Sequence, residues 1–173
     1  GSTEALVASN VYTDVTEASL TRHRWRFATT QATLSLLSSA PTGRYSYAYQ
    51  MPTSPEVLQI ITVTVNDYVI PYGRYKDFIY VNDYGSTSTL VMDYIYKVGE
   101  AYFPPHFRLA LEYELASVFA GSVARDSAMI KQFKELSERQ FLVAKNIDSQ
   151  ETTTKVLDTN RFIGLRRSTR TDV

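Results

Sequence analysis

The stretch that decides the fold covers residues 104–153 and reads PPHFRLALEYELASVFAGSVARDSAMIKQFKELSERQFLVAKNIDSQETT. In its first half, apolar residues recur three and four positions apart, which places them on one stripe of a helix. These residues are Phe107, Leu111, Leu115, Val118 and Phe119. Arg108 and Glu112 lie four apart on the wet side, where they can pair. The spacing predicts an amphipathic helix that begins at the two prolines.

A second helical pattern follows, with apolar positions that alternate steps of four and three. This is the spacing of a seam along which one helix lies on another. The seam comprises Met129, Phe133, Leu136, Gln140, Val143 and Ile147. Gly121 supplies a stop, and Ser122 and Asp126 supply possible caps for a restart, so we expect an antiparallel helical hairpin.

The second helix is longer than a small core needs. A helix over residues 126–153 would be roughly 40 Å long at about 1.5 Å per residue. Part of it is therefore expected to pack on another protein body. The candidate residues for packing between subunits are Phe133, Gln140, Val143 and Ile147.

Composition is that of a globular protein. The chain has 173 residues, 44% hydrophobic and 21% charged, which suffices for one domain that carries a small insertion. Eighteen basic and eighteen acidic side chains leave no net charge, so attraction to nucleic acid would need a local patch. The absence of cysteine excludes disulfides and thiolate chemistry. The longest apolar run is far shorter than the roughly 20 residues of a membrane helix, so no membrane partner is expected.

The rest of the chain predicts one more helix and a β insertion. Ser2 or Thr3 can cap a first helix that runs to about Arg22. Residues 25–37 gain β-branched side chains and are interpreted as an extended strand. Over residues 45–98 the period changes to two, and the tetrapeptide Val-Asn-Asp-Tyr occurs twice, at 65–68 and 81–84, as a turn signal that ends a strand.

We therefore expect an α+β fold with a long C-terminal helical hairpin. Residues 1–24 and 104–154 would form a helical bundle, and residues 25–103 a mainly β insertion with an antiparallel sheet of about four or five strands. Residues 155–173 lose all periodicity and are interpreted as an extended docking tail.

The tail holds a short apolar group beside several arginines. Arginine and aromatic side chains carry much of the binding energy at protein interfaces, so this composition favours docking on a protein partner. The candidate docking residues are Arg161, Phe162, Ile163, Leu165, Arg166, Arg167 and Arg170.

Catalytic, cofactor and metal sites are not predicted. His23 and His106 lie outside any metal-ligand spacing, and Glu112 and Glu114 are two apart, so they face different sides of their helix. The chain has no glycine-rich phosphate loop, no Gly-x-Ser-x-Gly and no cysteine nucleophile. We expect a protein that is not an enzyme and binds no cofactor.

One basic and aromatic cluster leaves two interpretations open. Arg22, Arg24 and Arg26 surround Trp25 and could grip phosphate while the indole stacks on bases, as in a nucleic-acid-binding module. Alternatively, Trp25 anchors the core at the exit of the first helix while the arginines cap helix carbonyls and stay in water.

The order of several short stretches resembles a known family. Arg-His-Arg-Trp-Arg-Phe-Ala occupies residues 22–28, Tyr-Ser-Tyr-Ala-Tyr occupies 45–49 with Met-Pro at 51–52, and Phe-Pro-Pro-His-Phe occupies 103–107. In this order they are similar to motifs of the head-to-tail adaptors of short-tailed (podovirus) phages, the tail tubular protein A family. The motif residues expected in the core are Trp25, Phe27, Tyr47, Pro52, Tyr94, Phe107 and Leu115. Arg24 stands where the family usually has proline, and Pro104-Pro105 replaces an Asp-Pro pair.

The resemblance implies a structural virion protein. It implies a ring of twelve copies beneath the portal protein, joined to a tail nozzle (tail tubular protein B-like) and leaving a channel through which double-stranded DNA passes without sequence-specific binding. It places the protein in the tail or neck of the virion after assembly in the host cytoplasm. We expect the helical hairpin to pack subunits, the tail residues 161–170 to reach the portal, and the β insertion to face the tail side.

Overall fold

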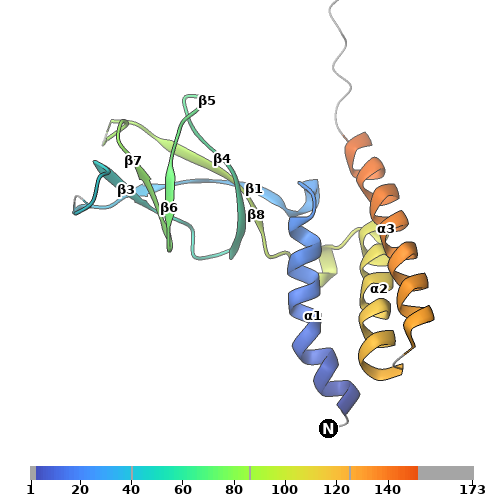
Figure 1. The fold of residues 1–173 in the computed structure, drawn as a ribbon. Helices are drawn as coiled ribbons and strands as arrows, with labels where there is room; N and C mark the ends of the chain where they lie inside the picture. The colour runs from blue at the N-terminus through green and yellow to red at the C-terminus, as the bar shows by residue number, and fades with distance from the viewer. Residues whose placement is uncertain (1–2, 40, 86, 125, 152–173) are drawn as a thin grey trace, which may run out of the picture.

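The computed structural model describes residues 3–39, 41–85, 87–124 and 126–151 of the chain. Within these residues the chain forms three α-helices and eight β-strands. The helices all lie on one side of the strands (Figure 1). The helices are α1 (Thr3–Thr21), α2 (Pro105–Phe119) and α3 (Ser127–Gln150). The strands are β1 (Thr29–Thr33), β2 (Ser35–Leu36), β3 (Tyr47–Gln50), β4 (Val57–Val65), β5 (Tyr68–Val69), β6 (Gly73–Tyr75), β7 (Phe78–Val81) and β8 (Leu90–Tyr96). This arrangement confirms the predicted α+β class.

The described strands form two antiparallel sheets of four strands each. The first sheet has the order β1-β8-β4-β5 and the second β2-β3-β7-β6. We expected one sheet of about four or five strands, fewer than the described residues contain. The strands that the prediction missed are short: β2 and β5 have two residues each and β6 has three. Strands this short contain too few alternations to be recognised by a period of two.

Both sheets share one apolar core. Val63 of β4 and Met92 of β8 belong to the same buried cluster as Tyr49 and Ile79 of the second sheet. Side chains from two facing sheets that meet in one core make a β-sandwich. The β insertion is therefore a small sandwich, seen on the side away from α3 in Figure 1.

The two Val-Asn-Asp-Tyr copies both end strands, as predicted. In the first copy Asn66 and Asp67 have positive φ angles of 49° and 65°, and Val65 pairs with Tyr68 across them. Two left-handed central residues are typical of a tight hairpin. In the second copy it is Tyr84 that takes the positive φ, at 71°.

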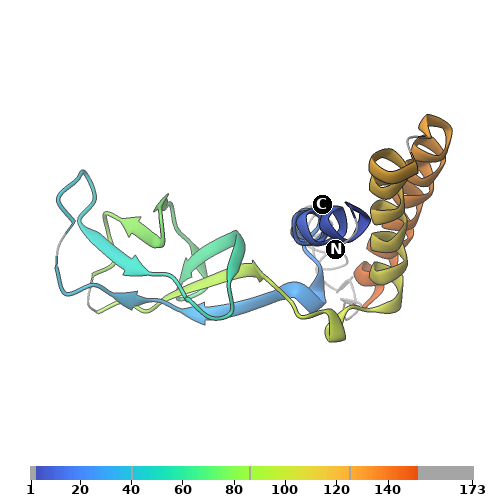
Figure 2. The same cartoon turned by 90° about the horizontal axis from the view of Figure 1, so that it is seen from below.

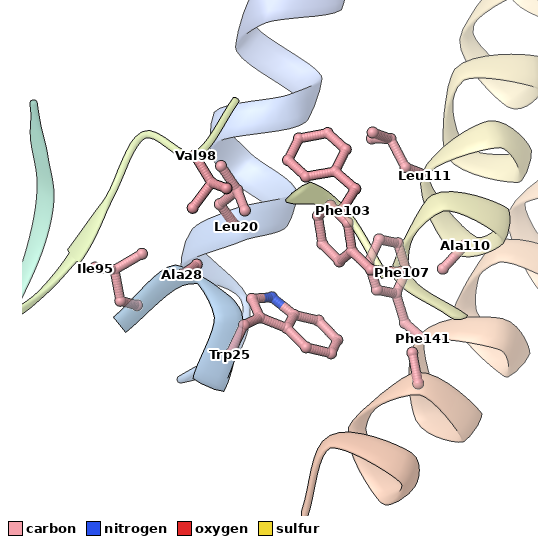
Figure 3. Packing of buried hydrophobic residues seen from close by; sticks show 11 residues of the cluster. Leu20, Trp25, Ala28, Ile95, Val98, Phe103, Phe107, Ala110, Leu111 and Phe141 are labelled. Atoms are coloured by element: carbon pink, nitrogen blue, oxygen red, sulfur yellow. The ribbon is translucent and has the colours of Figure 1, made fainter. Parts of the chain in front are cut away.

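The three helices pack side by side in the order α1, α2, α3 (Figure 2). Their core is centred on Trp25, which follows α1 and precedes the 3-10 turn η1 (Arg26–Ala28). Its ring lies 5.1 Å from that of Phe107 in α2 and 6.3 Å from that of Phe141 in α3, between ring centroids (Figure 3). Ile95 of β8 belongs to the same core, so the sandwich is anchored in the helical layer.

The hairpin forms, but Gly121 does not stop α2 as we expected. The chain continues past Phe119 as a π-helical turn, Ala120–Ala124, and Gly121 has no positive φ angle. Asp126 then caps α3, since its Oδ1 accepts hydrogen bonds from the N–H groups of Ala128 (2.9 Å) and Met129 (3.2 Å). The π-helical turn and the Asp126 cap thus lie between the two helices, where we expected a stop at Gly121.

Candidate functional site

Helix α3 carries two adjacent faces, and the predicted seam is the outer one. The buried residues of the helix are Ser137, Phe141, Ala144 and Asp148. Each follows a seam position by one residue, and successive helical residues are about 100° apart. The seam, which we expected to lie along another helix, is therefore turned aside from α2, because α2 takes the neighbouring face.

The outer face of α3 is apolar and accessible. Val143 is 44% exposed, Ile147 39% and Met129 40%, while Phe133 and Gln140 are half-buried. All four candidate subunit-packing residues, Phe133, Gln140, Val143 and Ile147, thus lie on one flank of α3. Leu142, which is 63% exposed, lies on the opposite flank beside charged residues. α3 is at the end of the helical layer, so no described helix covers the outer face (Figure 2).

A buried carboxylate helps to fix which face of α3 packs against α2. The side chain of Glu114 is 11% exposed and accepts hydrogen bonds of 2.6 Å from both Lys134 Nζ and Ser137 Oγ. Arg22 Nη2, at the end of α1, lies 3.3 Å from the same carboxylate. Burial alone would raise the pKa of Glu114, but these hydrogen bonds and the positive charges together hold the pKa below its usual value.

A second buried carboxylate ties the end of α3 to the exit of α1. Asp148 Oδ1 accepts a hydrogen bond of 3.0 Å from the backbone N–H of Arg26, and its Oδ2 lies 3.5 Å from His23 Nε2. The Asp148 side chain is almost fully buried. The last turn of α3 is therefore fixed beside η1, where the chain enters the sandwich.

Trp25 is the core anchor of the second interpretation, whereas the guanidinium of Arg22 contacts a carboxylate and not a helix carbonyl. Trp25 is fully buried, and its Nε1–H donates a 3.0 Å hydrogen bond to the carbonyl of Ser19. Arg22 stacks 4.7 Å above the ring of Phe141 and pairs with Glu114. The alternative in which the Trp25 indole stacks on bases is wrong, because a ring enclosed by the core cannot stack on a base.

Two other arginines of that cluster remain at the surface. Arg24 and Arg26 line a shallow hollow of about 460 Å³ with Gln31 of β1 and Asp93 of β8. One carboxylate oxygen of Asp93 is buried there without a hydrogen-bond partner among the described residues. The hollow brings both signs of charge together on the outer face of the first sheet, which is not the one-sign surface that a phosphate backbone needs.

The family-motif residues divide between the two cores. Trp25, Phe27 and Phe107 contact one another, and Leu115 packs against the same cluster. Tyr94 is buried in the sandwich core, and Tyr47 packs against that core. Pro52 is half-buried just after β3. The motifs thus mark two packing centres and not one site.

Exposed and half-buried tyrosines gather on the sandwich. Tyr45, Tyr75 and Tyr80 form a ring cluster with centroids 5.5–6.2 Å apart, and with Arg44 they line a groove of about 510 Å³. Arg44 Nη2 donates a 2.9 Å hydrogen bond to the Tyr75 hydroxyl. Other accessible apolar and aromatic residues of the sandwich are Tyr68, Val69, Tyr72 and Tyr84. Tyrosine combines an apolar ring with a polar tip, which suits a wet protein interface.

The candidate docking residues Arg161, Phe162, Ile163, Leu165, Arg166, Arg167 and Arg170 lie outside the described residues. Among the residues that are described, no group of three or more His, Cys, Asp or Glu side chains could hold a metal ion. None of the three described helices is long and apolar enough to span a membrane. His106 keeps its Nε2 enclosed without a hydrogen-bond partner in this part of the chain.

No protein-family model matches this chain, and no curated protein matches it either.

Sequence reasoning missed the polar anchors of α3. Glu114, Ser137 and Asp148 are buried and fix which face of α3 meets the core. The available signal was the set of small, polar and aromatic residues at four- and three-residue steps, Ser137, Phe141, Ala144 and Asp148, which runs parallel to the apolar seam. Their partners come from α1, η1 and α2, so the pattern of α3 alone does not distinguish them from exposed residues.

Proposed function

We propose that this protein is a structural component of a short-tailed phage, a head-to-tail adaptor that joins the portal protein to the tail nozzle. Many copies form a ring around a channel, and double-stranded DNA passes through it without sequence-specific binding. The protein acts in the tail or neck of the virion after assembly in the host cytoplasm. The support from sequence is the order of the motifs at residues 22–28, 45–52 and 103–107.

The observation that carries the proposal is the second face of α3. A helix whose core face is already filled by Phe141 and Ala144 carries a further apolar seam at heptad-like steps, with Val143 and Ile147 in solvent. Such a seam is stable in water when another helix or sheet covers it. A ring is built from heterologous contacts, so each subunit needs two different complementary faces, and the outer face of α3 supplies one.

The other parts of the molecule take the remaining contacts. In this proposal residues 161–170 dock on the portal, where arginine and aromatic side chains supply the anchors. The tyrosine-bearing sandwich faces the tail nozzle. The buried carboxylates of Glu114 and Asp148 are engaged in packing the helices, and the protein acts through binding alone.

The test is the native mass of the chain alone, with purified portal, and with portal after deletion of residues 155–173. The proposal predicts a complex of portal with several copies of the full chain, and no such complex with the truncated chain. The isolated chain is expected to assemble less readily, because a partner surface raises the local concentration of subunits. Absence of any complex between the full chain and portal at micromolar concentrations would refute the adaptor function.

A further inference from the structure

The second sheet carries a groove of about 510 Å³ on its outer face. Strands β3 and β7 direct Tyr49 and Ile79 into the sandwich core, so their alternate positions face outward. On that outer face Tyr80 pairs with Ala48 on one side and with Gly73 on the other. The small side chain of Ala48 leaves the surface hollow beside the Tyr80 ring, and both residues line the groove. Figure 1 shows β3, β6 and β7 at the end of the molecule away from the helices.

Two further tyrosines line the groove. Tyr45 covers Gly73, where an added Cβ would lie 2.5 Å from the Tyr45 hydroxyl oxygen, so any side chain at this position would displace the ring. The rings of Tyr45 and Tyr75 lie 5.7 Å and 5.5 Å from that of Tyr80, between centroids. Tyr75 is 50% exposed and the other two tyrosines are half-buried, so aromatic surface is open to a ligand.

Arg44 is held at the rim of the groove by two of these tyrosines. Its guanidinium carbon lies 5.2 Å from the centroid of the Tyr45 ring, and its Nη2 donates a 2.9 Å hydrogen bond to the Tyr75 hydroxyl. No carboxylate of the described residues forms an ion pair with Arg44. A guanidinium has five N–H donors, so most of them remain available to bind a carboxylate of another molecule.

A groove lined by tyrosines suits a proline-rich segment. Such a segment forms a polyproline II helix, which has no internal hydrogen bonds and loses little conformational entropy when it docks on aromatic rings. The carbonyl groups of this helix need donors from the partner. Tyr75 can supply one, because its hydroxyl accepts the hydrogen bond from Arg44 and keeps its own proton to donate.

We propose that this groove binds a proline-rich segment of a partner protein in which an acidic residue lies beside the prolines. The prolines pack among the tyrosine rings, and the carboxylate pairs with Arg44. A phosphate backbone suits the groove less well, because it needs several positive charges and the described lining residues include one. The inference rests on the proposed function only for the source of the segment, which is the tail nozzle.

The test is calorimetric titration of the full chain with two blocked proline-rich peptides, which differ only in a central glutamate or lysine. The glutamate peptide should bind about tenfold more tightly or better, because its carboxylate gains a charged hydrogen bond and the lysine is repelled. In Arg44→Glu this preference should reverse, a result that loss of folding cannot produce. Arg74→Glu is the matched control, since Arg74 is exposed on β6 but does not line the groove, and it should keep the preference of the parent.

A pair of glycine variants tests the tyrosine wall. Gly73→Ala should displace the Tyr45 ring and weaken the binding of the glutamate peptide about tenfold, whereas Gly43→Ala should bind as the parent does, because no atom lies within 4 Å of its added Cβ. Far-UV circular dichroism checks that both variants are folded.

Several outcomes would overturn the proposal. These are no binding of either peptide at millimolar concentration, equal binding of both, an unchanged preference in Arg44→Glu, and a groove that binds single-stranded oligothymidylate or a neutral oligosaccharide in place of the peptide. Loss of the peptide site with an intact portal complex would refute the groove assignment alone. Peptide binding without any portal complex would refute the adaptor function alone.

Discussion

Lys134 of α3 donates a 2.6 Å hydrogen bond to Glu114 of α2, and that carboxylate also accepts a hydrogen bond from Ser137. The three residues place a charge in the helical interface and leave its oxygens satisfied. A buried carboxylate with partners of this kind fixes the relative rotation of two helices, because any other rotation would bury the charge unpaired.

Replacing this carboxylate should destabilise the fold. Glu114→Gln removes the negative charge with which Lys134 and Arg22 form ion pairs. We expect the free energy of unfolding to fall by about 1–3 kcal/mol. Urea unfolding measures the change. Glu112→Gln, two positions away and exposed, should shift the same quantity by no more than about 0.5 kcal/mol. Equal effects of the two substitutions would contradict the role assigned to Glu114.

The same group predicts how stability depends on pH. The folded-state pKa of Glu114 lies below its ordinary value, so the unfolded chain takes up the proton first as the pH falls. Its contribution is fully present above the ordinary glutamate range, at about pH 4.3, and is lost as the pH falls through the folded pKa. Thermal melts between neutral and acidic pH should show a smaller acid loss in Glu114→Gln than in the parent. Parallel curves would contradict the lowered pKa.

Trp25 should behave as a core residue. Trp25→Ala removes a fully buried ring from between Phe107 and Phe141, and we expect a loss of about 3–5 kcal/mol in the free energy of unfolding. Chemical denaturation measures this loss. Tyr102→Ala, at an exposed aromatic residue of the 3-10 turn η2 (Glu100–Tyr102), is the control and should change it by less than about 0.5 kcal/mol.

The outer face of α3 should control assembly without affecting the fold. Val143→Glu places a charge in the proposed interface between subunits, so complexes with portal should contain fewer copies, as measured by native mass. Leu142→Glu changes the adjacent residue, which is more exposed but lies on the opposite flank, and should assemble as the parent does. If Leu142→Glu disrupts assembly and Val143→Glu does not, the interface lies on the other flank.

Nucleic-acid binding by the arginine cluster should be weak at most. With Trp25 enclosed and Arg22 paired to Glu114, we expect no shift of short duplex DNA at physiological salt. Gel-shift titrations at several salt concentrations measure this. A strong, salt-sensitive shift that Arg24→Ala abolishes would favour the alternative function over the adaptor.

The two faces of α3 show how much of this helix can be predicted from the sequence. Its heptad-like steps predict an apolar seam, and the structure places that seam on one flank of the helix. The pattern of one helix does not show which polar groups of other elements will contact it. Ser137 and Asp148 are buried because Glu114, Arg26 and His23 satisfy them, and these partners come from distant parts of the chain.

The strands show a different limit. The alternation of Ile61, Val63 and Val65 predicts a half-buried strand, and β4 contains all three. Val63 and Val65 lie in the sandwich core, whereas Ile61 packs against the helical core, because the register shifts between Ile60 and Thr62. Short strands such as β2 and β5 exist because longer neighbours pair with them, so their sequences hold little evidence of their own. The division of the strands between two facing sheets depends on that long-range pairing as well.

The sandwich is joined to the helices at paired neighbours. The chain enters it at Thr29 and leaves it near Ile95, and these two residues face each other across β1 and β8. Everything between them begins and ends at one point of the helical layer. Parts of this unit away from Leu58 and Ile61, which pack against the helical core, can therefore change without moving the helices, so the far end of the molecule is free to diversify in evolution independently of the helical layer.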